Sequence, residues 1–387
     1  MRICRVTTVP FVLRHHIGSQ IQATVAAGHE VHLISSPASD FADSSDGDPQ
    51  FGGARFHPIP IARNLSPLSD LRSLLALYRC FREIRCDIVH SVTSKAGLLC
   101  ALAGFAARVP LRLHTFAGQP WSGRTGPIRW ISKACDWLIV RLNTGCYADS
   151  ESQRAFLIQE GVAQDRHIRV LGAGSIAGVD LVRFSATRFD RKQARADLAI
   201  PARAMVIVFV GRISREKGVG ELAAAFEQLN QGHPGQLHLL LIGPFETGRN
   251  ALAPETRRTL DHHAAIKVIG YTDKPEDYLA VADILCLPSY REGFGSVVIE
   301  AAAMGVPAVV TRVTGLVDAV VEGETGLMVP PCDVDALARA LARLRDDAGL
   351  RQRLGVAARD RARRLFDAAV VNQLVLADYE ALAGKRR

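Results

Sequence analysis

Short β-branched runs alternate with longer helical patterns along this sequence, and this alternation limits the folds open to it. The first half contains the apolar runs RICRVTT, HEVHLISS, DIVHSV, LRLHTF and GCYAD. After the polar stretch SATRFDRKQARADLAIPARA, the rhythm restarts with MVIVFVGR, LHLLLIG, IKVIG, DILCLP, PAVVT and TGLMVP. Such a pattern is typical of parallel sheets whose faces are both covered by helices. We therefore predict an α/β protein with two doubly wound, Rossmann-like domains.

The length supports two domains, because a single core rarely grows beyond roughly 250 to 300 residues and this chain has 387. We place the first domain at residues 1–178 and the second at residues 179–368. A last helical pattern, DAAVVNQLVLADYEALAG, leads into residues 369–387, which we expect to pack back across the domain junction. Between the first two apolar runs we expect one helix, RHHIGSQIQATVAAG, that ends at Gly28.

The net charge is +8, and basic residues far outnumber acidic ones between residues 55 and 141. Arg72, Arg79, Arg82 and Arg85 crowd one helical segment that also carries leucines and aromatic residues. An amphipathic basic helix can lie on an anionic membrane surface, although a solvated arginine face on a core helix would give the same pattern. Aromatic residues make up only 6% of the chain and do not form the kind of stacking platform that nucleic-acid binding requires.

No apolar run reaches the roughly 18 residues needed to span a bilayer, and the first residues read as a strand rather than a signal peptide. We therefore expect a cytoplasmic protein. The eight cysteines are scattered and have no zinc-binding spacing, so we expect reduced thiols in the core. The pair Asp333 and Asp335 imitates a metal motif, but it precedes the helical run ALARALARL, and we expect one of the two to cap that helix.

Ligands of open parallel sheets bind beyond the carboxyl ends of the strands, so the loops that follow the apolar runs are the candidate sites. In VFVGRISREKG, a turn at Gly211 is followed by Arg212 and Lys217, and a helix is expected to start near Gly218. Two cations beside a helix N-terminus favour an anion such as a phosphate. In KVIGYTD, backbone groups at Tyr271 could pair with the edge of a nucleobase.

The third loop lies in YREGFGSVVIEAAAMGVP, residues 290–307. It offers Glu292, then glycines that allow close approach of a ligand, then helical N–H groups without internal partners. Glu300 is the only charged residue in the helix that follows. A buried, unpaired carboxylate is costly, so Glu300 either forms a salt bridge with a neighbouring element or is kept for ligand hydroxyls, such as those of a ribose.

The motifs GRISREKG, REGFGSVVIEAAAMGVP and GETGLMVPPCD, in this order and with seven residues between Glu292 and Glu300, resemble those of the retaining glycosyltransferases of family 4. That family has the two-domain GT-B fold, with the domains facing across a cleft. In the first half, RVTTVPF, AAGHEVHLISS, CDIVHSVTSKAGLL, VPLRLHTFAGQPW and GAGSIAGVDLVRF resemble the branch that builds bacterial surface polysaccharides and lipid-linked oligosaccharides.

The resemblance implies a role for each matching residue. Arg212 and Lys217 would neutralise the donor diphosphate, Glu292 would hold the hydroxyls of the donor sugar, and Glu300 would hold the ribose. The other donor contacts implied are Gly211, Tyr271, Gly293, Phe294, Gly295, Ser296 and Val297, where Tyr271 would read uracil through its backbone.

The resemblance also implies a reaction and its partners. A sugar, a hexose or an N-acetylhexosamine, would pass with retention from a UDP-sugar to a lipid-linked glycan, and no metal or other cofactor would be needed. The protein would work as a peripheral protein on the anionic inner face of the cytoplasmic membrane. Two other functions stay open on this scaffold: a nucleotide-sugar epimerase or hydrolase, and a nucleotide-sugar-binding protein without catalysis.

The first half departs from the family pattern on the expected acceptor side. Many members have a histidine directly before the glycine of the loop HTFAG, where this chain has Ala117. His114 lies three residues earlier and is a weaker candidate for a substrate contact. The first loop, VPFVLRHHIGS, retains only Gly18 of the paired glycines common in the family.

Overall fold

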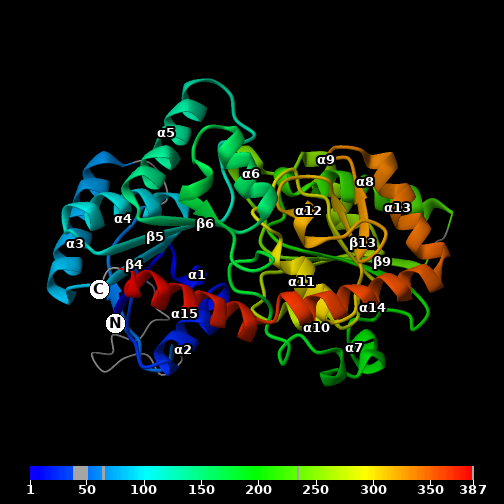
Figure 1. Cartoon of the computed structure of the whole chain (residues 1–387). Coiled ribbons are helices and arrows are strands. Elements are labelled where there is room, and N and C mark those ends of the chain that lie inside the picture. Colours follow the sequence, from blue (N-terminus) through cyan, green and yellow to red (C-terminus); the bar gives the residue numbers. More distant parts are fainter. Residues whose placement is uncertain (38–50, 63–65, 233–234, 386–387) are drawn as a thin grey trace. The chain divides into compact units, whose positions relative to one another are not determined.

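The computed structural model describes residues 1–37, 51–62, 66–232 and 235–385. The chain divides into two compact units. Unit 1 comprises Met1–Gly178 together with Ala368–Arg387, and unit 2 comprises Val179–Asp367. In each unit, helices cover a parallel sheet (Figure 1), which confirms the predicted α/β class with two Rossmann-like domains.

Within the described residues, the sheet of unit 1 has seven strands, all parallel. They are β1 (Arg2–Val6), β2 (Glu30–Ser35), β3 (Arg55–Pro58), β4 (Ile88–Val92), β5 (Leu111–Phe116), β6 (Gly145–Ala148) and β7 (Ile168–Arg169), in the order β3-β2-β1-β4-β5-β6-β7. Every residue of the central strand β4 is buried, as expected for a strand covered on both faces. The edge strand β3 is largely accessible.

The helices of unit 1 fill the connections between these strands. They are α1 (Pro10–His15), α2 (Gly18–Ala26), α3 (Pro67–Ile84), α4 (Ser94–Ala106), α5 (Gly126–Leu142) and α6 (Glu151–Gln159). The single helix expected before Gly28 is therefore wrong in one respect, because it is broken at residues 16 and 17 into α1 and α2. Gly28 does end it, with a left-handed φ of 80°.

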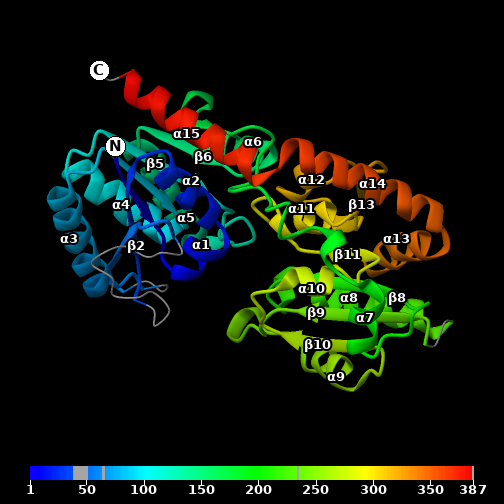
Figure 2. The ribbon, with the colours of Figure 1, turned by 90° about the horizontal axis from the view of Figure 1, so that it is seen from below.

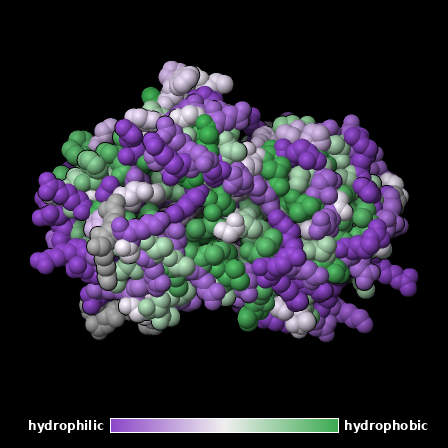
Figure 3. Space-filling view, in the orientation of Figure 1, coloured by the Kyte–Doolittle hydropathy of each residue, from purple (hydrophilic) through white to green (hydrophobic). Residues whose placement is uncertain are grey.

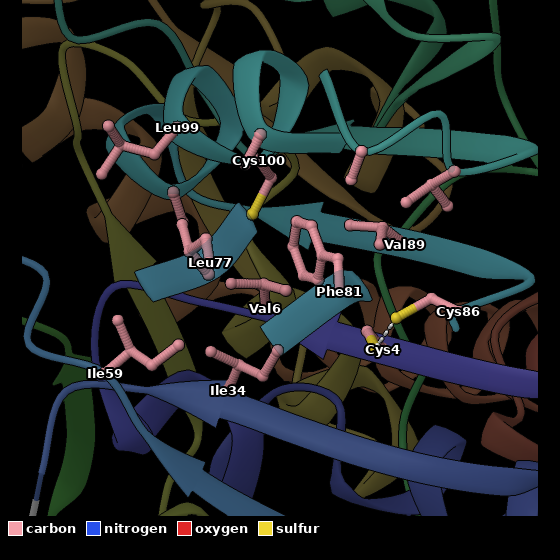
Figure 4. Close-up of a cluster of buried hydrophobic side chains, with 14 of the residues drawn as sticks. Cys4, Val6, Ile34, Ile59, Leu77, Phe81, Cys86, Val89, Leu99 and Cys100 are labelled. Carbon is pink, nitrogen blue, oxygen red and sulfur yellow. Dashed lines mark hydrogen bonds between the residues drawn. The ribbon is translucent and has the colours of Figure 1, made fainter. Parts of the chain in front are cut away.

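Helices α3 and α4 pack on β1 and β4 through one large apolar cluster (Figure 4). Leu77 and Phe81 of α3 meet Val6 and Val89 of the sheet in this cluster. Cysteine side chains also fill it, and all eight cysteines of the chain are free thiols, five of them buried. Burial raises the pKa of the Cys4 thiol well above its ordinary value, which keeps this group uncharged in the core.

The final helix, α15 (Ala368–Gly384), follows unit 2 in the sequence but belongs to unit 1, where it packs beside α2 (Figures 1 and 2). Its buried residues recur at helical spacing on one face. Tyr379 on this face is fully buried, and its hydroxyl accepts a hydrogen bond from Arg5 Nη1 at 2.8 Å. The predicted C-terminal helix is therefore present, and a buried polar contact fixes where it packs.

The sheet of unit 2 has six parallel strands among the described residues, as predicted from the six apolar runs. They are β8 (Met205–Val210), β9 (Leu237–Ile242), β10 (Ile266–Gly270), β11 (Ile284–Leu287), β12 (Ala308–Thr311) and β13 (Gly326–Val329), in the order β10-β9-β8-β11-β12-β13. The order reverses between β8 and β11, and a reversal of this kind is where open α/β sheets bind ligands.

Eight helices accompany this sheet in the described part of unit 2. They are α7 (Arg191–Asp197), α8 (Val219–Gln231), α9 (Pro254–His262), α10 (Pro275–Leu279), α11 (Ser296–Ala303), α12 (Leu316–Ala319), α13 (Val334–Asp346) and α14 (Ala348–Leu365). Asp333 caps α13 by accepting a hydrogen bond from the Ala336 N–H at 2.8 Å, as predicted. Helix α7 forms within the polar stretch SATRFDRKQARADLAIPARA.

Candidate active site

The start of α8 packs directly against the chain that leaves β11. Gly218 precedes α8 with a left-handed φ of 68°, and a Cβ atom there would lie 2.1 Å from the carbonyl oxygen of Pro288. Only glycine allows this approach. The close contact brings Lys217, which ends the loop after β8, beside Glu292, which lies in the loop after β11.

Lys217 and Glu292 form an ion pair at this point. Nζ of Lys217 donates to Oε1 of Glu292 at 2.5 Å, and Oγ of Ser289 donates to the same oxygen at 2.8 Å. Both charged side chains are mostly buried, with exposed fractions of 17% and 13%. Only one of the three ammonium protons and one of the two carboxylate oxygens take part in these bonds. The pair therefore keeps hydrogen-bonding capacity for a ligand.

Arg212 belongs to a chain of alternating charges beside this pair. Its guanidinium donates to Glu246 at 2.5 Å and to Glu216 at 2.8 Å, and Arg291 donates to the other oxygen of Glu216 at 2.7 Å. Burial acts to raise the pKa of Glu216, but the hydrogen bonds and charges of Arg291 and Arg212 outweigh it and lower that pKa. Glu216 thus stays ionised and holds both arginines, while Arg212 remains about half exposed, at 48%.

The glycine-rich loop before α11 is tightly shaped by its neighbours. Gly295 has a φ of 90°, and a Cβ atom on Gly315 would lie 2.6 Å from the backbone of Gly293. Phe294 is buried and its ring packs 5.2 Å from that of Phe366. The Phe294 side chain is therefore a core anchor for the loop, and only its backbone is placed where a ligand contact was predicted.

Helix α11 begins at Ser296 without a side-chain cap. Gly295, the cap residue, accepts a backbone hydrogen bond from Val298. Within the described residues, the N–H groups of Ser296 and Val297 have no acceptor. Such first-turn N–H groups, together with the helix dipole, favour an anion.

Glu300 lies one turn into α11, as predicted, and its carboxylate has no hydrogen-bond partner in the part of the chain that the structure describes. Burial raises the pKa of Glu300 to about 7, while the charge of Arg183 acts to lower it and that of Glu276 to raise it. Among the described residues Arg183 forms no hydrogen bond with Glu300: its Nε and Nη2 donate to Glu276, at 2.9 and 2.8 Å, and Nη2 also donates to the backbone oxygen of Asp273. The salt bridge of Arg183 is therefore formed with Glu276 and not with Glu300.

Tyr271 follows β10, the edge strand, so that β9 lies between it and β8. Its side chain is exposed. The ends of these strands are tied together by glycines: Gly211 N–H donates to the β9 end at 2.9 Å, and Gly243 N–H donates to Gly270 at 2.8 Å. A Cβ atom on Gly243 would lie 1.9 Å from the oxygen of Gly211. At the carboxyl edge of the sheet, the ends of β8, β9 and β10 are therefore in close backbone contact.

His114, in unit 1, is a core residue. Its ring is 1% exposed, contacts Ser91 Oγ at 2.9 Å and packs edge-on against Phe116. A Cβ atom on Gly97 of α4 would lie 2.4 Å from the imidazole, so the ring fills a space left by that glycine. Burial lowers the pKa of His114 to about 3. The candidate substrate contact is thus a neutral, enclosed side chain, whereas Ala117 lies exposed at the loop.

Several residues of the site escaped the sequence analysis. Arg183 lies at the start of unit 2, and Glu276 lies in the first turn of α10. Glu216 lies inside the predicted phosphate loop, between Arg215 and Lys217 in the sequence, but its contact with Arg291 comes from a distant loop. In the described residues, no group of three or more His, Cys, Asp or Glu side chains is arranged to hold a metal ion. No helix in those residues is both long and apolar enough to cross a membrane.

Two family models match the chain. Residues 190–361 match the glycosyl transferases group 1, and residues 13–174 match a glycosyl transferase 4-like domain. The two matches cover most of unit 2 and most of unit 1, respectively.

Known proteins resemble the chain over most of its length. It is 30% identical to the capsular polysaccharide biosynthesis glycosyltransferase CapM of Staphylococcus aureus, over 91% of this chain and 90% of that one. It is 25% identical to the UDP-Gal:alpha-D-GlcNAc-diphosphoundecaprenol alpha-1,3-galactosyltransferase of Escherichia coli, over 82% and 80%. The solved structure of HepE from Anabaena with UDP and glucose has the same fold, with a TM-score of 0.79, 20% identity and coverage of 98% and 100%. The chain therefore belongs to the glycosyl transferases of group 1.

Proposed function

We propose that this protein transfers a hexose or an N-acetylhexosamine from a UDP-sugar to a lipid-linked glycan in surface polysaccharide synthesis, with retention of the anomeric configuration. The observation that carries the proposal is the uncommitted carboxylate of Glu300. It lies on the helix that follows the Lys217–Glu292 loops, at the point where the strand order reverses. A carboxylate without a hydrogen-bond partner among the described residues suits ligand hydroxyl groups better than a structural role.

The donor diphosphate would be bound by Arg212, Lys217 and the first N–H groups of α11. A phosphate oxygen can replace the Glu246 contact of Arg212, because one charge-assisted hydrogen bond is exchanged for another. Lys217 would turn its remaining protons to the same diphosphate. These fixed positive charges stabilise the charge that develops on the leaving nucleotide, and the proposed mechanism therefore uses no metal ion.

The two carboxylates would divide the remaining work. Glu300 would accept hydrogen bonds from the ribose hydroxyls, and binding would favour its ionised form because the hydroxyls donate to it. Glu292, held by Lys217 and Ser289, would fix the hydroxyls of the donor sugar. The backbone beyond β10, near Tyr271, would pair with uracil.

The reaction would proceed on one face of the sugar. The bond between the anomeric carbon and the phosphate oxygen breaks, and the acceptor oxygen bonds to that carbon from the same side. The acceptor's proton passes to an oxygen of the leaving phosphate, so no side chain needs to form a covalent intermediate. The rate would come mainly from positioning and from stabilisation of the leaving group.

The acceptor is proposed from the names of the relatives. The Escherichia coli relative is named for a UDP-galactose donor and a diphosphoundecaprenol-linked acceptor, and the Staphylococcus aureus relative for capsular polysaccharide. An acceptor on a polyprenol carrier is held in a membrane. We therefore propose that the protein works in the cytoplasm as a peripheral protein on the inner face of the membrane.

A panel of UDP-sugars and GDP-sugars, each incubated with lipid acceptors from bacterial membranes, tests this function. We expect one UDP-sugar to support transfer to lipid, with the donor's anomeric configuration kept in the product. Transfer only from GDP-sugars would contradict the donor assignment, and an inverted product would contradict the mechanism. Rapid turnover of a UDP-sugar without any acceptor would instead favour an epimerase or hydrolase.

A further inference from the structure

Helix α5 exposes large apolar side chains along its outer face. Trp130 is 65% exposed and Trp137 is 49% exposed, and Ile128 and Ile131 beside them are also exposed. Single exposed apolar residues are common in soluble proteins, but a group of large ones on one helix marks an interaction surface. Two indoles in such a group are typical of surfaces that meet the interface of a lipid bilayer.

The inner face of α5 is firmly attached to unit 1, so the outer face is presented on a fixed support. Trp121 Nε1 donates to the buried Asp136 of α5 at 2.7 Å. Arg129 and Lys133 of the helix both pair with Glu160, at 2.8 and 2.9 Å. The cations on the inner face are thus already paired with Glu160, and the apolar residues on the outer face stay exposed.

Helix α3 adds a second exposed surface with a positive charge. Leu68, Leu71, Leu75 and Tyr78 are exposed along it, and arginines are exposed between and beyond them: Arg72, Arg79, Arg82 and Arg85. None of these arginines forms an ion pair with a described residue. Asp70 of the same helix is already paired with Lys95. The charges that remain on this helix surface are therefore mainly positive.

The two helices belong to one layer, because α4 packs against both α3 and α5. Phe105 of α4 is exposed as well. Figure 3 shows hydrophobic residues at the surface over α3 and α4, with strongly hydrophilic ones beside them. Arg124 and Arg141 are exposed near the two ends of α5. Apolar side chains framed by unpaired arginines match the two parts of an anionic bilayer surface, its acyl boundary and its headgroups.

We propose that this α3–α5 surface, consisting of the exposed apolar residues and arginines of α3, α4 and α5 named above, docks the protein on an anionic lipid bilayer. Trp130 and Trp137 enter the interface, and the arginines of α3 contact the headgroups. The proposal deepens the proposed function and rests on it for the lipid-linked acceptor. It moves the main contact from the arginine helix, which the sequence indicated, to the indoles of α5.

The three tryptophans of the chain allow a direct test, because Trp121 is buried and the other two lie on the proposed surface. Vesicles of phosphatidylcholine mixed with phosphatidylglycerol should shift the tryptophan emission to the blue, and brominated acyl chains should quench it. Vesicles of phosphatidylcholine alone should bind much less of the protein. The double variant Trp130→Ser/Trp137→Ser should sediment with the mixed vesicles at least about tenfold more weakly.

A control variant and a charge variant sharpen the test. Val182→Ser/Val356→Ser removes two exposed apolar residues of unit 2 and should leave vesicle binding unchanged. Arg72→Gln/Arg79→Gln/Arg82→Gln should weaken binding about tenfold or more at low salt and have less effect at high salt. Vesicle binding by the tryptophan double variant at the level of the native chain would overturn the proposal.

Two further readouts separate this proposal from others. UDP affinity, measured without vesicles, should be the same in the tryptophan variant and the native chain. This equality would show that the substitutions change the docking surface and not the donor site. If vesicles bind as predicted but no sugar transfer is found with any donor, the proposed function fails and the surface stands. If the double variant instead converts a dimer to a monomer in analytical ultracentrifugation and still binds vesicles, the surface joins two copies and the proposal is wrong.

Discussion

The two units share a strand order but use its reversal point differently. In unit 1, Arg5 of β1 and His90 of β4 are joined through Tyr379: Arg5 donates to Gln20 and to Tyr379, and His90 contacts Tyr379 at 2.5 Å and Thr115 at 2.8 Å. All five residues are buried. This network fixes α15 to the sheet of unit 1 and leaves these groups little capacity for a ligand.

In unit 2, the loops after β8 and β11 hold charged groups that remain partly accessible. Arg212 is about half exposed, the Lys217–Glu292 pair keeps unused hydrogen-bonding capacity, and Glu300 has no hydrogen-bond partner among the described residues. The comparison indicates that residue type alone does not mark a site. What distinguishes the two edges is whether the polar groups satisfy one another or remain available.

The largest expected effect concerns the cations of unit 2. Lys217→Ala and Arg212→Ala should each lower the rate of sugar transfer by at least about a hundredfold, because each removes charge stabilisation of the leaving diphosphate. Arg215→Ala is the matched control: it removes an exposed cation from the same loop and should change the rate little. Near-normal transfer by both Lys217→Ala and Arg212→Ala would refute the diphosphate assignment.

A substitution in the hydrogen-bond network of unit 1 should change the stability of the protein rather than its affinity for the donor. Tyr379→Phe removes the hydroxyl that Arg5 and His90 contact, and it should lower the free energy of unfolding by about 1–3 kcal/mol, because buried polar groups lose their partner. Urea unfolding measures this loss, and UDP affinity should stay the same. Tyr78→Phe, at an exposed tyrosine, is the control. A large loss of UDP affinity in Tyr379→Phe would show that the two edges are not as different as we infer.

A smaller effect is expected from the pH dependence of stability. The pKa of Glu300 is raised from 4.5 to about 7 by burial, so between these values the folded chain binds more protons than the unfolded chain. Stability therefore falls as pH rises from about 4.5 to about 7. Glu300→Gln should raise the melting temperature at pH values above 7 and have little effect near pH 4.

Glu276→Gln provides the contrast for that measurement. Glu276 is buried and binds Arg183 through both oxygens, so its loss should lower the melting temperature at neutral pH. Equal changes in melting temperature in Glu300→Gln and Glu276→Gln would indicate that Glu300 has a structural partner.

Much of the fold could be predicted from periodicity. The six apolar runs of the second half are the six strands, and DAAVVNQLVLADYEALAG contains α15. The edge strand β3 was missed, because RFHP is short and its residues are largely accessible. The break between α1 and α2 was also missed, since the residues around it still have a helical pattern. The periodicity of apolar residues reflects which side chains are buried. It is therefore weakest at sheet edges and at turns, where burial is incomplete.

The candidate site was predicted less completely, because pairing partners come from distant parts of the chain. Lys217 and Glu292 were both identified, but their contact depends on the approach of Gly218 to Pro288. Arg183 reaches Glu276 from 93 residues away, and nothing in either local sequence indicates the pair. The burial of His114 depends on Gly97, which no sequence pattern connected to it.

The affinity of UDP for Glu300→Ala and Glu292→Ala, measured by calorimetry, tests the central claim most directly. Glu300→Ala should weaken UDP binding by about tenfold or more, because hydrogen bonds from hydroxyls to an ionised carboxylate are lost. Glu292→Ala should leave UDP affinity nearly unchanged and lower the rate of sugar transfer. An equal loss of UDP affinity in the two variants, or none in Glu300→Ala, would contradict the division of roles between the two carboxylates.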